Sequence, residues 1–327
     1  MRALVTGAAG FVGSHLTELL LNRGREVFGF VLDRDDIGNL ADALGGEHAS
    51  RLRLVEGDLS DEGLLAKAMQ DICPDEVYHL AAQSSVRQSA EDPAATFRIN
   101  ALGTRTLLEA VRRATCRPRI LYVGSAEAYG ESARTARPLS ESSLLLPMTP
   151  YGSSKAAAER IVLRYGSEHG LRCVRVRPFP HTGPRHAPNF VYPNLAKQLC
   201  EIQAGSRPRQ LQIGNLEVRR DLSDVRDVVA AYLLALERGE TGAVYNVCCG
   251  RVASVREVLD ILIAMTGLDI EVVVQTDRVR SHDLQVLSGS NQSLNAQTGW
   301  EPRIPLETTL RDLLSYWQSR CGLRERG

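Results

Sequence analysis

The chain has 327 residues, 43% of them hydrophobic and 24% charged, which is the size and composition of a soluble globular protein with one or two domains. Its 39 lysines and arginines balance 39 aspartates and glutamates, so no net charge attracts nucleic acid or an acidic membrane surface. Its apolar stretches fall well short of the roughly 20 residues that a membrane span requires. We therefore expect neither a nucleic-acid partner nor a membrane partner.

Short apolar, β-branched runs alternate with segments of helical period over residues 2–178. Because several runs are apolar at nearly every position, helices must cover both faces of the sheet, as they do in parallel sheets. The pattern predicts a doubly wound α/β domain with a parallel sheet, of the Rossmann type, over residues 1–178. Its expected strands, in chain order, are Ala3 to Val5, Val27 to Leu32, Leu52 to Val55, Glu76 to Leu80, Ile120 to Val123 and Cys173 to Val176.

Beyond Pro178 the composition changes, because five prolines fall between Pro178 and Pro193. Crowded prolines predict a long loop rather than a regular element. We expect a smaller C-terminal α/β domain over residues 179–327 that binds the substrate, with the chain near residues 220–250 returning to the first domain.

The start of the chain and its cysteines indicate a compartment. The strand-like run at Ala3 follows Met1 without a basic or apolar leader. The seven cysteines are odd in number and scattered, without a CxxC pair. These features favour free thiols in a reducing compartment over disulfides or a zinc site. We expect a cytoplasmic protein with no metal.

A glycine-rich turn lies between the first strand and the first helix. It reads Thr6-Gly7-Ala8-Ala9-Gly10-Phe11-Val12-Gly13, in the GxxGxxG form. In this position the glycines permit a tight turn and close helix packing, and the helix N-terminus faces a pyrophosphate. A tight turn without a ligand is the alternative, and the strand-turn-helix context favours a bound dinucleotide.

The adenosine end of the dinucleotide should meet the next two strand ends. A carboxylate after the second strand favours NAD and a basic residue favours NADP, and the chain offers both Asp33 and Arg34. The choice between NAD and NADP stays open. Asp58, followed by Leu59, lies where a carboxylate can accept from the adenine amino group, or it is a solvated loop residue.

Tyr151 and Lys155 are four residues apart on an expected helix and share one face. The ammonium is expected to lower the pKa of the phenol, which can then act as a general acid or base. Upstream, Ser125 and Glu127 follow a strand, at the sheet edge where ligands bind. Ser125 can hydrogen-bond the substrate oxygen that Tyr151 protonates, although a turn serine is the plainer interpretation.

Together the segments TGAAGFVGSHL, HLAAQSSV, GSAEAYG and YGSSK resemble the extended short-chain dehydrogenases/reductases that act on nucleotide sugars. The resemblance implies that Ser125, Tyr151 and Lys155 are catalytic and that a hydride moves between NAD or NADP and a sugar carbon. It implies cofactor contacts at Leu80, Ala81, Ala82 and Pro178, and substrate contacts at Ser84 and Ser85.

The C-terminal part resembles GDP-mannose 4,6-dehydratases and, more closely, GDP-4-keto-6-deoxymannose reductases. The matching segments are Gly214 to Asp221, Val244 to Cys248, Gly289-Ser290 and Thr298 to Trp300. The resemblance implies that Arg220 and Arg280 bind the diphosphate, that Asp283 binds a ribose, and that Asn189, Phe190, Val191 and Lys197 lie along the nucleotide. Solvated surface charge is the alternative for the charged residues.

One loop departs from the family. Where the family has asparagine before histidine, this chain has Pro180 before His181. Proline removes an amide side chain and a backbone donor, so one contact to the sugar or diphosphate is lost. His181 is either a substrate contact or an ordinary loop histidine. The sugar and base therefore stay open.

The function expected is reduction of the 4-keto group of a GDP-linked 4-keto-6-deoxy sugar. The alternatives are a GDP-mannose 4,6-dehydratase with Glu127 as the base at C5, another nucleotide-sugar epimerase or reductase, and a cofactor-binding regulator that is no enzyme. Intact Tyr151 and Lys155 speak against a regulator. The resemblance also implies a homodimer that pairs the helix from about Pro93 to Ala114 and the helix carrying Tyr151.

Overall fold

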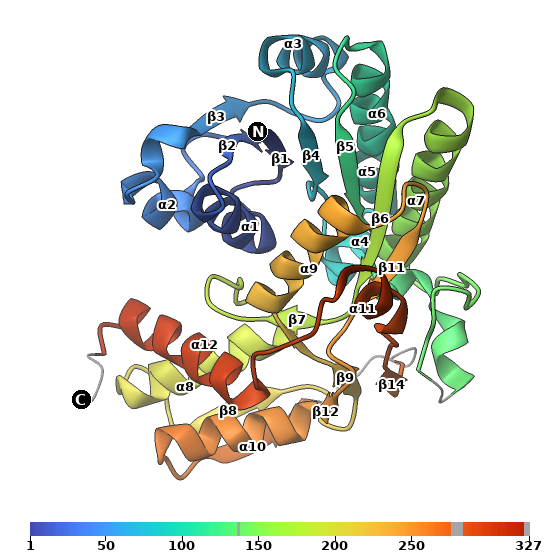
Figure 1. The fold of residues 1–327 in the computed structure, drawn as a ribbon. Coiled ribbons are helices and arrows are strands. Elements are labelled where there is room, and N and C mark those ends of the chain that lie inside the picture. Colours follow the sequence, from blue (N-terminus) through green and yellow to red (C-terminus); the bar gives the residue numbers. More distant parts are fainter. Residues whose placement is uncertain (136–137, 276–283, 324–327) are drawn as a thin grey trace.

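The computed structural model describes residues 1–135, 138–275 and 284–323 (Figure 1). A parallel sheet of seven strands forms the upper half of the molecule in this view. Its order is β11 (Val244–Val247), β6 (Arg172–Pro178), β5 (Arg119–Val123), β4 (Glu76–His79), β1 (Arg2–Thr6), β2 (Glu26–Val31) and β3 (Leu52–Glu56). The doubly wound α/β fold is confirmed, and each expected strand is present.

Helices cover both faces of this sheet, and its central strands are accordingly buried on both sides. Leu16 and Leu20 of the first face and Leu107 and Val111 of the second are buried against strands. The first face carries α1 (Phe11–Asn22), α2 (Ala41–Gly45), α9 (Val225–Arg238) and α11 (Gln292–Thr298). The second carries α3 (Glu62–Ile72), α4 (Val86–Glu91), α5 (Pro93–Phe97), α6 (Gly103–Arg113) and α7 (Pro150–His169).

A second hydrophobic core lies in the lower half of Figure 1. It is formed by helices α8 (Val191–Gln203), α10 (Val255–Thr266) and α12 (Leu306–Arg320). Small sheets flank them: β8 (Gln210–Ile213) with β13 (Glu271–Val274); β12 (Val252–Ser254) with β9 (Arg219–Asp221) and β14 (Val286–Leu287); β7 (His181–Thr182) with β10 (Ser223–Asp224). A capping box between Ser254 and Glu257 starts α10.

Short helical turns complete the described elements. The 3-10 turns are Gly38–Leu40, Ala49–Arg51, Ala126–Ala128 and Glu131–Thr135, and a π-helix spans Arg98–Leu102 between α5 and α6. None of the helices within the described ranges has the length and apolar character needed to cross a membrane.

After β6 the chain runs through the lower half of the molecule, and it returns to the sheet with α9 and β11. β11 pairs with β6 in parallel, in register from Val244 opposite Arg175 to Val247 opposite Pro178. The domain division at residue 178 stays a prediction. Residues 225–247 nevertheless pack with the first core rather than the second.

Candidate active site

The glycine turn connects β1 to α1 and is shaped by close backbone contacts. Gly7 has a φ of +73°, and a Cβ there would lie 2.9 Å from the backbone of Ala81. A Cβ on Gly13 would collide with the Gly7 carbonyl, so α1 packs directly on the turn. Gly10 is the N-cap of α1 and provides no side-chain cap, which leaves the first N–H groups of the helix for an anion. The turn therefore fits a pyrophosphate at the head of α1.

The ends of β2 and β3 hold the residues expected at the adenosine. Asp33 accepts a hydrogen bond from the Asp35 amide (2.8 Å), and Arg34 donates to the Leu54 carbonyl (2.8 Å) on β3. Both side chains are exposed. Backbone and side-chain hydrogen bonds from Ser60 lower the pKa of Asp58. The Leu59 side chain is buried against Gly103, so only its backbone is left for the cofactor.

A buried histidine supports the end of β4, where Leu80, Ala81 and Ala82 follow. His79 is hydrogen-bonded to Thr6 (2.8 Å) and to Thr104 (2.9 Å), and the Ala81 amide donates to the same Thr6 hydroxyl. Burial and the Lys155 charge lower the pKa of His79 to about 3. A neutral histidine thus ties α6 to the strand end beside the glycine turn.

Ser84 and Ser85 continue this strand end. Ser84 is exposed, whereas Ser85 is the N-cap of α4 and its hydroxyl accepts from the Gln88 amide (3.2 Å). The Ser85 hydroxyl therefore already caps a helix, and a substrate that bound this hydroxyl would share it with the Gln88 amide.

Ser125 and Tyr151 meet at the carboxyl end of the sheet. Ser125 follows β5 and starts the 3-10 turn Ala126–Ala128 by accepting from the Glu127 amide (3.1 Å). Tyr151 lies in the first turn of α7, which begins with the Thr149 cap and Pro150. The Ser125 hydroxyl lies close enough to the Tyr151 phenol to lower the pKa of that phenol. The expected pair is therefore together.

Lys155 lies one helical turn beyond Tyr151 and is 5% exposed. Its ammonium donates to the Val123 carbonyl (3.0 Å) and lies 5.7 Å from the centroid of the Tyr122 ring. Burial lowers the pKa of Lys155 to about 8. The sheet edge thus holds a cation that titrates near neutral pH.

The pKa of Tyr151 differs from the sequence expectation. Burial raises it to about 12, the charge of Glu127 raises it further, and the Ser125 hydrogen bond lowers it only in part. The prediction that Lys155 lowers this pKa is wrong for this structure, because burial is the largest effect and the ammonium bonds to Val123 instead. The phenol is therefore protonated at neutral pH and can donate a proton.

Glu127 lies in the turn between Ser125 and Tyr129, half-buried. Its carbonyl is so close to α7 that a Cβ on Gly152 would lie 2.6 Å from it. Its charge acts on the phenol of Tyr151. A carboxylate, a serine and a tyrosine therefore converge at this edge.

Sequence reasoning missed Asn100, which is 2% exposed in the π-helix Arg98–Leu102. Its amide oxygen accepts from the Gln83 amide (2.8 Å), and its amide nitrogen donates to the Gln83 carbonyl (3.1 Å) and to Ser154 (2.9 Å). Asn100 therefore joins the strand end after β4 to α7 between Tyr151 and Lys155. An asparagine on the apolar side of a helix was the signal available in the sequence.

The loop after β6 packs on the glycine turn. Pro178 ends β6, and the carbonyl of Pro180 accepts from the Ser223 amide (3.0 Å). The ring of His181 stacks on Phe11 (centroids 5.9 Å apart), and that of His186 stacks closer (4.2 Å). Burial lowers the pKa of both histidines. The sugar-side loop and the cofactor turn therefore share one aromatic cluster.

The remaining expected substrate residues are spread along the lower half. Phe190 is the N-cap of α8, with Asn189 and Val191 exposed beside it. Arg220 donates to the Leu284 carbonyl (2.8 Å).

Lys197 instead faces α12, with Glu201 at 3.6 Å and the centroid of the Trp317 ring at 5.9 Å. These contacts are with the second core, not with the catalytic cluster. Arg280 and Asp283 lie outside the described residues.

The parallel sheet, the glycine turn and the Ser125, Tyr151 and Lys155 cluster define an NAD(P)-dependent enzyme of the short-chain dehydrogenase/reductase class. Within that class, the family model described as GDP-mannose 4,6 dehydratase matches residues 4–313, and the chain belongs to this family. The family expected from the sequence motifs is confirmed.

Relatives of known name span nearly the whole chain. A GDP-6-deoxy-D-mannose reductase of Pseudomonas aeruginosa is 36% identical over 98% of each protein, and GDP-mannose 4,6 dehydratase 1 of Arabidopsis thaliana is 33% identical over 94% of this chain and 87% of its own. Among solved structures, RMD from Pseudomonas aeruginosa complexed with NADPH matches with a TM-score of 0.84 and 34% identity, covering 98% of this chain and 99% of its own. A Thermus thermophilus UDP-glucose 4-epimerase complexed with NAD matches with a TM-score of 0.84 and 32% identity, covering 97% and 99%.

Proposed function

We propose that the protein reduces the 4-keto group of a GDP-linked 4-keto-6-deoxy sugar with NADPH or NADH. The observation that carries the proposal is the Tyr151 phenol, which lies beside Ser125 at the carboxyl end of the sheet, one helical turn from Lys155. Reduction of a ketone needs a proton donor at the oxygen, which this phenol provides. The full-length likeness to a relative named as a GDP-6-deoxy-D-mannose reductase supports the same substrate class.

The cofactor fits the chain's own geometry. Gly7 and Gly13 allow turn and helix to approach closely, and the backbone of Gly10, Phe11 and Val12 faces the place of a pyrophosphate. When bound, the nicotinamide supplies the hydride. The remaining proposed cofactor contacts are Asp33, Arg34, Asp58, Leu59, Leu80, Ala81, Ala82 and Pro178. The likeness to a structure complexed with NADPH supports NADP, with Arg34 as the basic residue after β2.

In the proposed mechanism the Ser125 hydroxyl orients the ketone oxygen toward Tyr151. A hydride reaches C4 and the Tyr151 phenol gives its proton to the oxygen, which yields the alcohol and a phenolate. In the structure the ammonium of Lys155 donates to the Val123 carbonyl, and it would stabilise that phenolate only after leaving Val123 for a cofactor ribose.

The second candidate is a GDP-mannose 4,6-dehydratase with Glu127 as the base at C5. Glu127 is close enough for its charge to act on Tyr151, which favours this candidate. A dehydratase must also remove the C5 proton and expel the C6 hydroxyl, two steps that a reductase does not need. The likeness to the relative named as a GDP-6-deoxy-D-mannose reductase, at 36% identity over 98% of each protein, favours the reductase over the dehydratase.

The substrate side is the less constrained part of the proposal. Arg220 with Arg280 would bind the diphosphate and Asp283 a ribose, since guanidinium forks suit phosphate and carboxylates suit vicinal hydroxyls. Ser84, Ser85, His181, Asn189, Phe190, Val191 and Lys197 complete the proposed contacts. For Lys197 this requires leaving Glu201.

We also propose a cytoplasmic homodimer. The seven cysteines are free thiols, as expected in a reducing compartment. Exposed apolar side chains gather on the expected dimer helices, with Phe97 at the end of α5, Ile99 and Leu102 in the π-helix, and Leu163 on α7. An exposed apolar patch of this kind is typical of a protein interface.

The proposal is tested with purified protein, GDP-mannose, a known GDP-mannose dehydratase, and absorbance of added NADPH or NADH. The expected result is stoichiometric oxidation of the dinucleotide only when the dehydratase has supplied the keto sugar. Product from GDP-mannose alone, without net absorbance change, would establish the dehydratase instead, because the hydride taken from C4 then returns to C6.

A further inference from the structure

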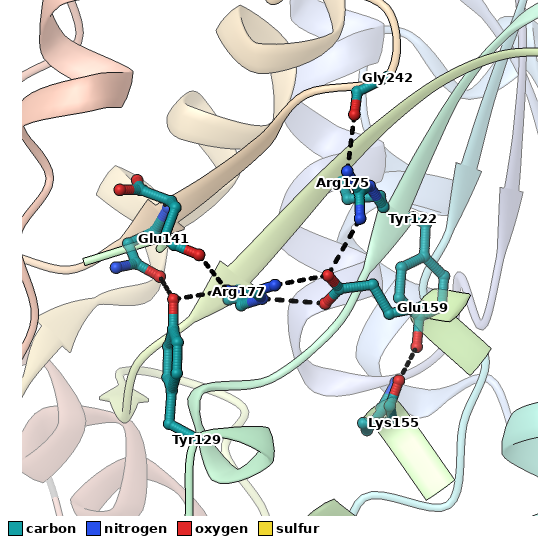
Figure 2. Close-up of polar contacts among 9 residues, drawn as sticks. Tyr122, Tyr129, Glu141, Lys155, Glu159, Arg175, Arg177 and Gly242 are labelled. Carbon is teal, nitrogen blue, oxygen red and sulfur yellow. Dashed lines mark hydrogen bonds and ion pairs between the residues drawn. The ribbon is translucent and has the colours of Figure 1, made fainter. Parts of the chain in front are cut away.

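One arginine, Arg177, lies between Glu159 on one side and Tyr129 and Glu141 on the other (Figure 2). Arg177, on β6, is 5% exposed. Its Nε and Nη2 donate to the two carboxylate oxygens of Glu159 (2.9 and 2.6 Å). Its Nη1 donates to the Tyr129 hydroxyl (2.8 Å) and to the Glu141 carbonyl (3.1 Å). A single guanidinium thus contacts a helix, a turn and a loop.

Each of these contacts leads to a residue of the proposed reaction. Glu159 lies on α7, four residues after Lys155 and eight after Tyr151, on the same helix face. Tyr129 directly follows the 3-10 turn Ala126–Ala128, which Ser125 caps. Arg177 therefore connects the helix of Tyr151 with the turn of Ser125 through side chains alone.

The hydrogen bonds through Tyr129 have a fixed direction. A guanidinium only donates, so the Tyr129 hydroxyl accepts from Arg177 and donates its own proton to the amide oxygen of Asn246 (2.6 Å). The amide nitrogen of Asn246 donates in turn to the Leu139 carbonyl (2.9 Å). The Arg177 guanidinium also lies over the Tyr129 ring, with its carbon 4.9 Å from the ring centroid. The hydroxyl consequently has one orientation.

The charges in this cluster are costly to bury. The Glu159 carboxylate accepts a hydrogen bond from Arg175 as well as those from Arg177, and all three residues are less than 10% exposed. Buried ion pairs contribute little net stability compared with apolar side chains of the same volume, whereas they do fix geometry. The arrangement is therefore better explained by positioning than by stability.

We propose that Arg177 is a positioning residue, which acts through Tyr129 and Glu159 to hold the turn of Ser125 against the helix of Tyr151. This inference rests on the proposed role of Tyr151 as the proton donor. Loss of the Tyr129 hydroxyl releases the Ser125 turn from Arg177, while α7 stays attached through Glu159.

The test compares Tyr129→Phe with a matched control, Tyr245→Phe. Tyr129→Phe keeps the ring against the guanidinium and removes only the hydroxyl. Tyr245, on β11, is equally a buried tyrosine whose hydroxyl bonds inside the protein, to the Glu240 amide (3.0 Å), outside the Arg177 cluster. Tyr245→Phe loses one hydrogen bond, to the Glu240 amide, whereas Tyr129→Phe loses two, one to Arg177 and one to Asn246, and only Tyr129→Phe loses a contact to Arg177.

The expected result is a kcat at least about tenfold lower for Tyr129→Phe, with KM and dinucleotide Kd within about twofold of the parent. Tyr245→Phe should keep kcat within about twofold. Amide hydrogen exchange of residues 125–131 should quicken in Tyr129→Phe only. An unchanged kcat for Tyr129→Phe, or an equal loss in both variants, would overturn the proposal.

Two further arms keep the outcomes separate. If the parent turns over no nucleotide sugar, the proposed function fails, and hydrogen exchange alone tests the positioning role of Arg177. Faster exchange at residues 125–131 in Tyr129→Phe then supports that role, and unchanged exchange rejects it. If Tyr129→Phe does not fold, Arg177→Lys replaces it. Lysine keeps the charge beside Glu159, but its single ammonium cannot also hold Tyr129, so the same drop in kcat is expected.

Discussion

Replacing Lys155 with methionine should make the protein more stable and inactive. Lys155 is 5% exposed, and burial lowers its pKa from 10.5 to about 8. At about 1.4 kcal/mol per pH unit, that difference corresponds to about 3 kcal/mol of cost for keeping the ammonium in the fold. Methionine removes this cost and loses the hydrogen bond to Val123, which contributes about 1 kcal/mol. The expected net gain is about 2 kcal/mol at pH 7.

The gain should depend on pH in a defined direction. Below pH 8 the lysine is protonated in both the folded and the unfolded chain, so the folded protein bears the full cost. Between pH 8 and 10.5 the folded protein loses the proton first, and the parent therefore becomes more stable relative to the variant. By pH 10 the advantage of Lys155→Met should be close to zero.

Denaturant unfolding at pH 7, 9 and 10 measures this difference. Lys67→Met is the control, because Lys67 is 76% exposed and pairs with Asp71 on the surface of α3, where a substitution changes stability by about 0.5 kcal/mol or less. A Lys155→Met protein that is less stable than the parent at pH 7, or whose advantage does not shrink as the pH rises, would refute the reasoning. Turnover and dinucleotide affinity should both fall in the variant, whichever way its stability moves.

Three other substitutions test separate parts of the structure. Tyr151→Phe should lower kcat by about 10²-fold and leave dinucleotide affinity nearly intact, which steady-state kinetics and a binding titration would show; full activity would remove Tyr151 from the mechanism. His186→Phe should keep the stack on Phe11 but remove a pH dependence of stability. Because the pKa of His186 is lowered from 6.5 to about 3, the unfolded parent takes up a proton between pH 7.5 and pH 5 and the folded parent does not, which costs the parent about 2 kcal/mol of stability. Denaturant unfolding of the variant should lack that loss. Leu163→Arg, on the exposed apolar side of α7, should give monomers in light scattering at micromolar concentration, and a monomeric parent would contradict the dimer itself.

Features that depend on neighbouring residues could be predicted from the sequence. The glycine turn at Gly7 to Gly13 and the pair Tyr151 and Lys155 are local patterns, set by backbone conformation and by helical spacing. The parallel sheet follows from strands that are apolar on both faces. These features can be predicted without knowledge of the tertiary contacts.

Features that depend on distant segments could not. The Asn100 amide bonds to Ser154, and Arg177 bonds to Glu141 as well as to Glu159, so these roles emerge only when the elements have packed. The pKa of Tyr151 was misjudged because proximity in sequence to a lysine says nothing about how deeply the phenol is buried.

Lys197 shows the same limit on a helix surface. The pattern of α8 does not say which of its sides α12 will cover, and that packing brings Lys197 to Glu201 and Trp317. Resemblance assigned this residue to the nucleotide without that information.

The return of the chain to its first sheet affects how the protein can be made. A ribosome that has released β1 to β6 has not yet produced α9 or β11, so the edge of β6 has no partner strand. Val174 and Val176 on that strand, and Leu16 and Leu20 on α1, then lack Val228 and Tyr232, which complete their core. An open edge and a bare apolar face are what chaperones bind and what promotes aggregation. Completion of the N-terminal sheet therefore waits until Val247 has left the exit tunnel.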